Sequence, residues 1–64
     1  MNDTDVIQAA YADALHRLFA VFLEGLAAAG GDADRQTQAA ATFKSGLVLA
    51  RMARDQAMKM VRLA

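Results

Sequence analysis

The sequence predicts an all-α fold: a two-helix antiparallel hairpin that assembles into a four-helix bundle as a homodimer or higher oligomer. A Gly-Gly-Asp break at residues 30–32 divides the 64-residue chain, which contains no proline, into two stretches of near-equal length. Apolar residues recur at helical spacing in both stretches. Hydrophobic residues make up 56% of the chain, which is more than a lone helical pair of this size can bury.

The first helix is expected over about residues 4–29 of a single domain that spans residues 1–64. Asp3 or Thr4 is expected to cap its first free amide groups. Its apolar residues share one arc of a helical wheel, and Phe19 and Leu23 widen that arc to more than half of the circumference. A two-helix monomer cannot cover so wide an arc, so the pattern favours an oligomer.

The second helix is expected over about residues 33–62, after a turn at residues 30–32. Gly30 and Gly31 tolerate positive φ at the end of the first helix, and Asp32 or Asp34 is expected to cap the second. Small side chains dominate one stripe along the second helix, in which successive residues are alternately four and three positions apart. Its members are Ala39, Phe43, Gly46, Ala50, Ala53, Ala57 and Met60. Such a stripe predicts a close approach between helix backbones.

A predicted oligomer interface combines apolar residues of both helices. It consists of Ile7, Tyr11, Leu15, Leu18, Phe22, Leu26, Phe43, Leu47, Ala50, Ala53, Ala57 and Val61. A chain of this length builds only a marginal core, and small domains usually add a disulfide, a metal or a partner subunit. The chain has no cysteine and one histidine, which leaves oligomerisation as the expected route to stability.

Charge is segregated between the two halves of the chain, although the net charge is zero. Residues 1–32 carry a net charge of −4, and residues 33–64 carry a net charge of +4. We favour a structural interpretation, in which an acidic helix lies beside a basic one. The alternative is an anion or nucleic-acid contact along the basic side of the second helix. Its residues would be Lys44, Arg51, Arg54, Lys59 and Arg62, with Asp55 among them and no interleaved aromatic residue.

Catalytic and metal-binding residues are sparse. Asp13 and His16 are spaced i, i+3, like the Glu-x-x-His pairs of ferritin-like di-iron bundles, but they lie on the polar side of their helix. We interpret Asp13 as a solvated partner of Arg17, and we predict no metal site and no cofactor. The chain has no cysteine, and Ser45 is its only serine, so no nucleophilic triad can be assembled and an enzyme is not expected.

Two further surfaces bear on partners. Met52, Met58 and Met60 give the C-terminal end a soft apolar surface, which predicts either ordinary oligomer core or a docking surface for another protein. The most apolar stretch, residues 18–29, is interrupted by Glu24 and is shorter than the roughly 20 residues of a membrane span. The amino terminus is acidic, unlike that of a secretory signal. A soluble cytoplasmic protein without a membrane span is therefore expected.

In length, turn position and topology the predicted hairpin resembles the plasmid-encoded Rop-type RNA-binding proteins, in which two helical hairpins pair into a four-helix bundle. The resemblance extends to architecture and matches no sequence motif. The expected function is non-catalytic: a small homo-oligomeric module for protein–protein interaction that acts as an adaptor or regulator. The alternatives are a Rop-like RNA-binding regulator that uses the basic side of the second helix, and a metal- or cofactor-binding bundle.

Overall fold

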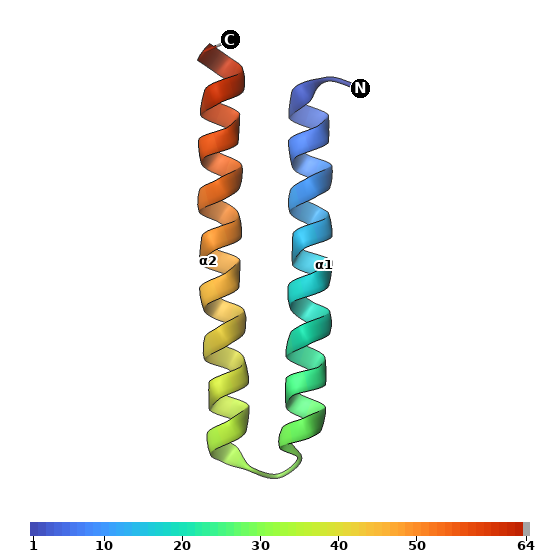
Figure 1. Ribbon diagram of the computed structural model, residues 1–64, viewed down its shortest axis with the longest axis vertical. Helices are drawn as coiled ribbons and strands as arrows, with labels where there is room; N and C mark the ends of the chain where they lie inside the picture. The colour runs from blue at the N-terminus through green and yellow to red at the C-terminus, as the bar shows by residue number, and fades with distance from the viewer. Residues whose placement is uncertain (64) are drawn as a thin grey trace.

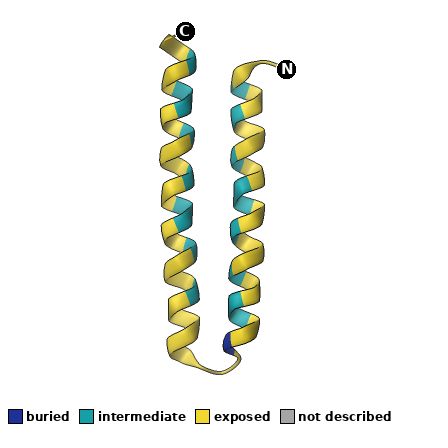
Figure 2. Cartoon of the chain, in the orientation of Figure 1, coloured by how far each residue is buried: buried dark blue, intermediate teal, exposed yellow. Residues whose placement is uncertain are grey.

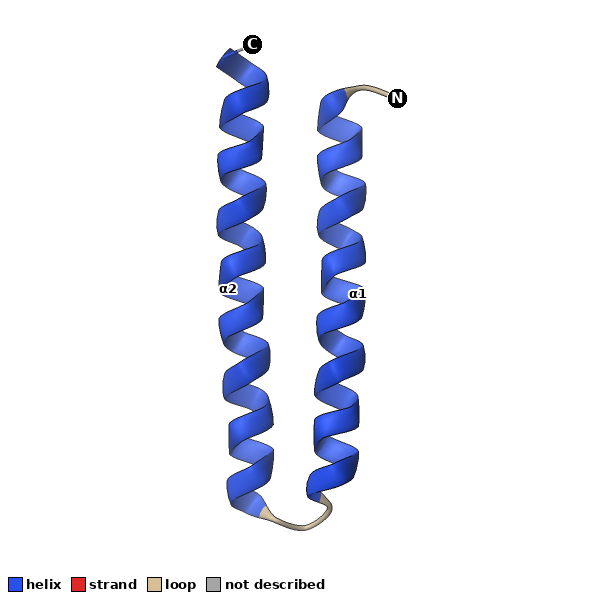
Figure 3. Ribbon diagram, viewed as in Figure 1, coloured by secondary structure: helices blue, strands red, loops and turns tan. Residues whose placement is uncertain are grey.

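The computed structural model describes residues 1–63 and contains two helices. Helix α1 spans Asp3–Ala29 and helix α2 spans Ala33–Leu63. The two helices run antiparallel and side by side, joined by a short turn (Figures 1 and 3). The predicted hairpin is confirmed, and the bounds of the helices differ from the expected ones by a single residue at each open end.

Helix α1 begins after Asn2, which lies one residue before Asp3 and two residues before Thr4, the two predicted caps. Asn2 has an extended backbone, and its side-chain oxygen accepts a hydrogen bond from the Asp5 N–H at 2.9 Å. Asparagine caps helices about as well as aspartate and better than threonine, so all three residues are competent caps and the helix begins after the first of them. Asp3 and Asp5 then lie in the first turn, where carboxylates interact favourably with the helix dipole.

The turn is closed by backbone hydrogen bonds around Gly30. Gly30 has φ 55° and ψ −121°, a conformation that L side chains rarely adopt. Its N–H donates to the Leu26 carbonyl at 3.2 Å, and the Asp32 N–H donates to the Ala29 carbonyl at 2.9 Å. The Gln36 side-chain amide donates to the Gly30 carbonyl at 2.7 Å. These bonds satisfy carbonyl groups that the end of α1 would otherwise leave without partners.

Asp32 caps the start of α2, as one of the two sequence alternatives predicts. Its carboxylate accepts hydrogen bonds from the N–H groups of Asp34 and Arg35 at 3.0 and 3.2 Å. Asp34, the other alternative, lies in the first turn of α2 instead. The chain therefore reverses direction within residues 30–32, as expected.

The hairpin is a single layer of helices. Its Cα atoms extend over 49 × 18 × 6 Å. Stable domains usually bury apolar surface between two or more layers of secondary structure. Within residues 1–63, Ala29 beside the turn is the one buried residue, and half-buried residues line the facing sides of the two helices (Figure 2). One hairpin thus has a seam between its helices but almost no interior.

The seam is rotated slightly from the predicted stripe of α2. Five of the seven stripe residues are half-buried, whereas Ala53 and Met60 are exposed. Residues spaced alternately by four and three recur on average every 3.5 residues, whereas a straight α-helix has 3.6 residues per turn. Such a stripe therefore drifts around the helix by about 20° per heptad. Arg54 and Val61, one position further along, are half-buried in the seam instead.

Small residues bring the two backbones together at two heights. Leu18 lies over Gly46, where an added Cβ atom would sit 2.5 Å from Leu18 Cδ2. Gly25 faces Ala39, and a Cβ atom at Gly25 would sit 3.1 Å from the Ala39 Cβ. The predicted close approach is therefore present between the two helices of one chain.

Candidate interaction faces

The predicted interface residues hold the two helices of one chain together. Eleven of the twelve are half-buried in the seam, and Ala53 is the exposed exception. Large apolar side chains outside the seam remain uncovered. They are Val6, Phe19, Val21 and Leu23 of α1 and Val48, Leu49, Met52, Met60 and Leu63 of α2. The predicted interface omitted this second set; the wide apolar arc of the first helix was the signal that pointed to part of it.

The register of the hairpin follows from two aromatic contacts. The rings of Phe22 and Phe43 stack with their centroids 4.8 Å apart and an interplanar angle of 21°. The Arg54 guanidinium carbon lies 4.4 Å from the centroid of the Tyr11 ring. Both pairs have residue numbers that add to 65. Residues at equal height on α1 and α2 can therefore be paired along the whole hairpin.

Among residues 1–63, Arg54 is the one cation within the seam. Its side chain is 30% exposed, and its Nε atom donates to the Asp55 carboxylate at 3.1 Å. The contact with Tyr11 is a cation–π interaction, which is strengthened when water is excluded. Arg54 thus belongs to the hairpin and is not available as a free cation for an anionic ligand.

One flat side of the hairpin, the groove face, has grooves that are lined by alanines and by larger apolar residues. It is defined by Ala10, Ala14, Val21 and Ala28 of α1 and by Arg35, Thr42 and Ala53 of α2. Two open grooves of about 380 and 260 Å³ follow one another along it. Ala10, Val21 and Ala28 lie within about 20° of one another around α1, so both grooves open on the same side.

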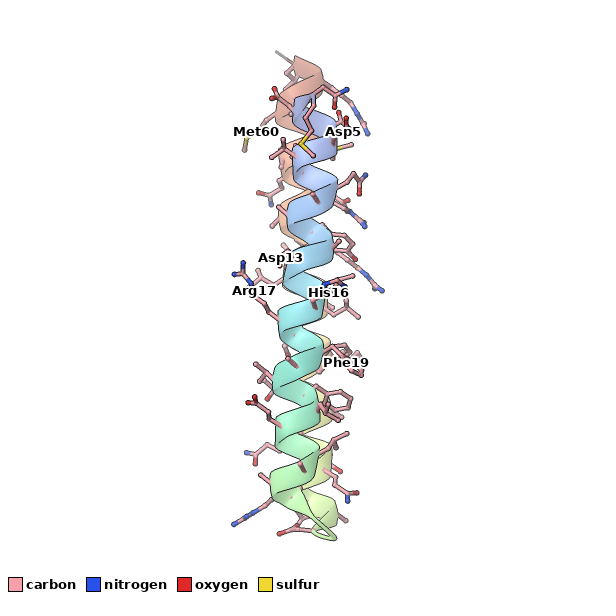
Figure 4. The ribbon with its side chains drawn as sticks, turned by 90° about the vertical axis from the view of Figure 1, so that its right-hand side faces the viewer. Asp5, Asp13, His16, Arg17, Phe19 and Met60 are labelled. Atoms are coloured by element: carbon pink, nitrogen blue, oxygen red, sulfur yellow. The ribbon has the colours of Figure 1, made fainter. Side chains whose placement is uncertain are left out.

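The opposite flat side, the basic face, combines large apolar residues with cations. It is defined by Phe19 and Leu23 of α1 and by Lys44, Val48, Arg51 and Arg62 of α2. Phe19 lies about 160° from Val21 around α1. Figure 4 shows Phe19 projecting on one side of the hairpin and Met60 on the other. The three cations lie within about 20° of one another around α2, and all are exposed.

Every ion pair within residues 1–63 joins residues that are close in sequence. The pairs are Arg17–Asp13, Arg35–Asp32 and Arg54–Asp55. None of these pairs crosses from α1 to α2, although the helices carry opposite net charge. In this part of the chain Lys44, Arg51, Lys59 and Arg62 form no ion pair, so the hairpin itself leaves them free.

Asp13 and His16 do not form a metal site within one chain. The Asp13 carboxylate pairs with Arg17, as the sequence predicts. Figure 4 shows Asp13 and Arg17 on one side of α1 and His16 projecting to the other. Among residues 1–63, His, Cys, Asp and Glu side chains nowhere gather in a group of three that could hold a metal ion.

The C-terminal end of α2 exposes part of its methionine surface. Met52 and Met60 are 51% and 67% exposed, whereas Met58 is half-buried against α1. An open hollow lies on the side of α2 that faces away from α1. Its lining consists of Lys44, Ser45, Val48, Leu49 and Met52. The predicted soft apolar surface thus lies on several sides of α2.

Helix α1 has the length and apolar composition of a membrane-spanning helix. The expectation of no membrane span depended on residues 18–29 alone, but alanine and valine before them extend the apolar character over Asp3–Ala29. Helices that pack inside soluble assemblies, and signal sequences, have the same properties. Length and composition therefore select neither environment for α1.

No protein-family model matches this sequence, and neither curated proteins nor solved structures give a significant match to it. The function is therefore inferred from the geometry and charge of the hairpin.

Proposed function

We propose that this protein is a non-catalytic, self-associating helical module that works through protein–protein contacts as a cytoplasmic adaptor or regulator. Two hairpins stack face to face as a four-helix bundle, either as a homodimer or as the unit of a higher oligomer. The exposed methionines at the C-terminal end of α2 then provide a surface for another protein. Asp13, Arg17 and Glu24 on the exposed side of α1 favour water over a bilayer, since charges in the hydrocarbon region are costly.

The exposed surface of the hairpin carries this proposal. One chain exposes 4931 Å². A compact monomer of 6.8 kDa exposes roughly 4,000 Å². The excess of roughly 1,000 Å² per chain is close to the 800 Å² or so that each partner buries in a stable interface. One partner hairpin therefore accounts for the missing burial.

The shape of the chain supports the same conclusion. The radius of gyration is 15.0 Å. A compact domain of this length has a radius of gyration of roughly 11 Å. A second layer of helices would thicken the hairpin and would cover the apolar residues of one flat face. Both changes bring the assembly closer to an ordinary two-layer domain.

Self-association can be tested by sedimentation and by thermal unfolding over a range of protein concentrations. We expect a dimer or larger species, and a melting temperature that rises with protein concentration because folding and association are linked. A compact monomer that unfolds cooperatively at a temperature independent of concentration would contradict the proposal.

A nucleic-acid-binding regulator is the second candidate. One observation favours it: Lys44, Arg51, Lys59 and Arg62 form no ion pair within residues 1–63. Free cations in a row could follow phosphate groups, with an affinity that falls steeply as salt rises. Asp55 interrupts the row, and the nearby cation Arg54 already contacts Tyr11 and Asp55.

A further inference from the structure

We infer that a second copy of this chain covers the groove face, with the two turns at opposite ends, so that Val21 of each copy enters the smaller groove of the other. The basic faces of both copies then point outward. This inference rests on the self-association proposed above, and it specifies which face takes part and how the two copies are oriented.

The area that one hairpin leaves exposed fits a single contact with a second copy. One chain exposes roughly 1,000 Å² more than a compact monomer of its mass. Each partner in a stable pair buries about 800 Å². One contact between two copies therefore accounts for the excess, and it covers one of the two flat faces.

Unpaired charge makes the basic face the more costly one to cover. Lys44, Arg51 and Arg62 lie on it, and none of them forms an ion pair within residues 1–63. Removal of an unpaired cation from water carries a large desolvation cost. On the groove face, by contrast, Arg35 already pairs with Asp32 beside the turn.

The other charged residues on the groove side of α1 lie at its margins. Asp3 is in the first turn of α1, at the open end of the hairpin. Arg17 lies about 20° beyond Ala10 and Ala28, at the outer edge of α1, and its side chain pairs with Asp13. Within residues 1–63, the middle of the groove face is therefore free of unpaired cations.

The groove side also exposes large apolar side chains. Val21, Leu49 and Met60 are 60%, 65% and 67% exposed. Leu49 and Met60 lie within about 20° of Thr42 around α2. Figure 4 shows Met60 on the side of the hairpin opposite Phe19. A second copy on the groove side would therefore remove apolar surface from water and leave the free cations hydrated.

The smaller groove, of about 260 Å³, offers space for a large side chain. Five alanines line it, which are Ala10, Ala14, Ala50, Ala53 and Ala57. Space left empty between packed helices is destabilising. Within residues 7–14 and 50–57, which span the height of this groove, Met52 is the one exposed large hydrophobic residue. Met52 lies on the side of α2 that faces away from α1, so it is not placed to fill the groove of a partner.

Two symmetric arrangements are open to a pair of flat hairpins stacked face to face. If the two-fold axis runs along the helices, the turns lie at the same end and residues of equal height meet. The smaller groove of one copy then faces the smaller groove of the other, and both stay unfilled. If the axis runs across the helices at mid-height, the turns lie at opposite ends, and each groove faces the other half of the partner.

The register of the hairpin shows which residue meets the smaller groove when the turns lie at opposite ends. Residues of equal height have numbers that add to 65, which places the middle of the hairpin near residues 16 and 49. Val21 lies about five residues, or roughly 7–8 Å, from this middle toward the turn. The smaller groove is centred about the same distance from it toward the open end. Val21 of each copy therefore lies over the smaller groove of the other.

The free cations of both copies lie on the outside of this dimer. Helix α2 of one copy covers α2 of the other, but Lys44, Arg51 and Arg62 point away from the contact. Two layers of helices separate the two sets of cations by roughly 20 Å, which exceeds the Debye length of about 8–10 Å. Met52 stays open to another protein, whereas Met60 takes part in the pairing.

A matched pair of substitutions tests which face is covered. Val21 and Phe19 are 60% and 57% exposed in one hairpin, so neither Val21→Lys nor Phe19→Lys should unfold it. We expect Val21→Lys to raise the Kd of the dimer by about tenfold or more, because a cation would have to enter an apolar groove. Phe19→Lys should leave the Kd within about threefold of wild type. A Val21→Lys dimer as tight as the wild type, or dissociation caused by Phe19→Lys, would overturn the inferred face.

Spin labels at the turn test the orientation. The chain has no cysteine, and a Cβ atom at Gly31 would meet nothing within 4 Å, so Gly31→Cys introduces a single labelling site. With the turns at opposite ends, we expect the distance between the labels of two copies to approach the 49 Å length of the hairpin. With the turns together, the distance would be roughly 10–25 Å, because the labels lie on adjacent layers of helices.

A label at Ser45→Cys, near mid-height on the exposed side of α2, reports association in either orientation because both give a separation well below the length of the hairpin. Short separations at both positions would overturn the inferred orientation and leave self-association intact. The absence of any separation between copies at both positions would overturn the self-association as well.

Discussion

Gly30 shows how much one residue determines in this chain. It is the only residue with positive φ among residues 1–63, and the turn that pairs the helices depends on it. Gly31 follows without positive φ and has open space around it. Of the two adjacent glycines, only Gly30 is required by the backbone.

We expect Gly30→Ala to lower the free energy of unfolding by about 1–3 kcal/mol, because a Cβ atom is strained at this φ. Gly31→Ala is the matched control and should change stability by about 0.5 kcal/mol or less. Denaturant unfolding at a single protein concentration measures both. Equal stability of the two variants would show that the turn tolerates a side chain at Gly30.

At the scale of the helices, each close approach in the seam places a glycine of one helix against a larger side chain of the other. Gly25 against Ala39 is the tighter case for substitution, because the neighbouring atom is a Cβ that moves only with its backbone. At Gly46 the neighbouring atom is the flexible end of Leu18, which can rotate away. Gly25 is therefore the seam position at which a larger side chain is hardest to accommodate.

A larger side chain at Gly25 should force the helices apart. We expect Gly25→Leu to cost about 1–3 kcal/mol of stability through overpacking, despite the better helix propensity of leucine. Ala27→Leu, on the exposed side of the same helix, is the control and should stay within about 0.5 kcal/mol of wild type. Thermal unfolding of both variants decides the matter, and an unchanged or higher stability of Gly25→Leu would contradict the close packing described here.

At the scale of the whole molecule, the protein is a thin plate with a grooved apolar side and a basic side. Opposite charges are divided between its helices, yet no ion pair in residues 1–63 joins them. The opposite net charges of α1 and α2 therefore act through the overall electrostatic field of each helix and not through ion pairs. This field extends over roughly 10 Å at ordinary salt concentration. Such a field affects how a second molecule approaches more than how one hairpin folds.

The triple variant Lys44→Gln, Arg51→Gln and Arg62→Gln separates structural from functional charge. We expect it to remain folded with little change in stability, because exposed charges contribute about 0–1 kcal/mol each. We also expect the wild type to show no salt-sensitive binding to RNA or DNA. Wild-type binding that weakens steeply with salt, and is lost in a folded triple variant, would instead support the nucleic-acid-binding candidate.

The sequence alone determined the two helices, their antiparallel pairing and the position of the turn. Local interactions explain this success: the Gly30 conformation, the Asp32 cap and the helical spacing of apolar residues act within a few residues of each other. The start of α1 was misplaced by one residue because Asn2, Asp3 and Thr4 are all competent caps.

The sequence identified eleven seam residues as interface, but only the tertiary structure decided that they join the two helices of one chain and that Ala53 lies outside the seam. The rotation of α2 about its axis depends on side chains of both helices, and the predicted stripe drifts around a helix of 3.6 residues per turn. That rotation exposes Ala53, brings Arg54 over Tyr11, and leaves Phe19 and the free cations together on one face. The candidate site is a product of this rotation, because angular position on one helix does not reveal what the other helix covers.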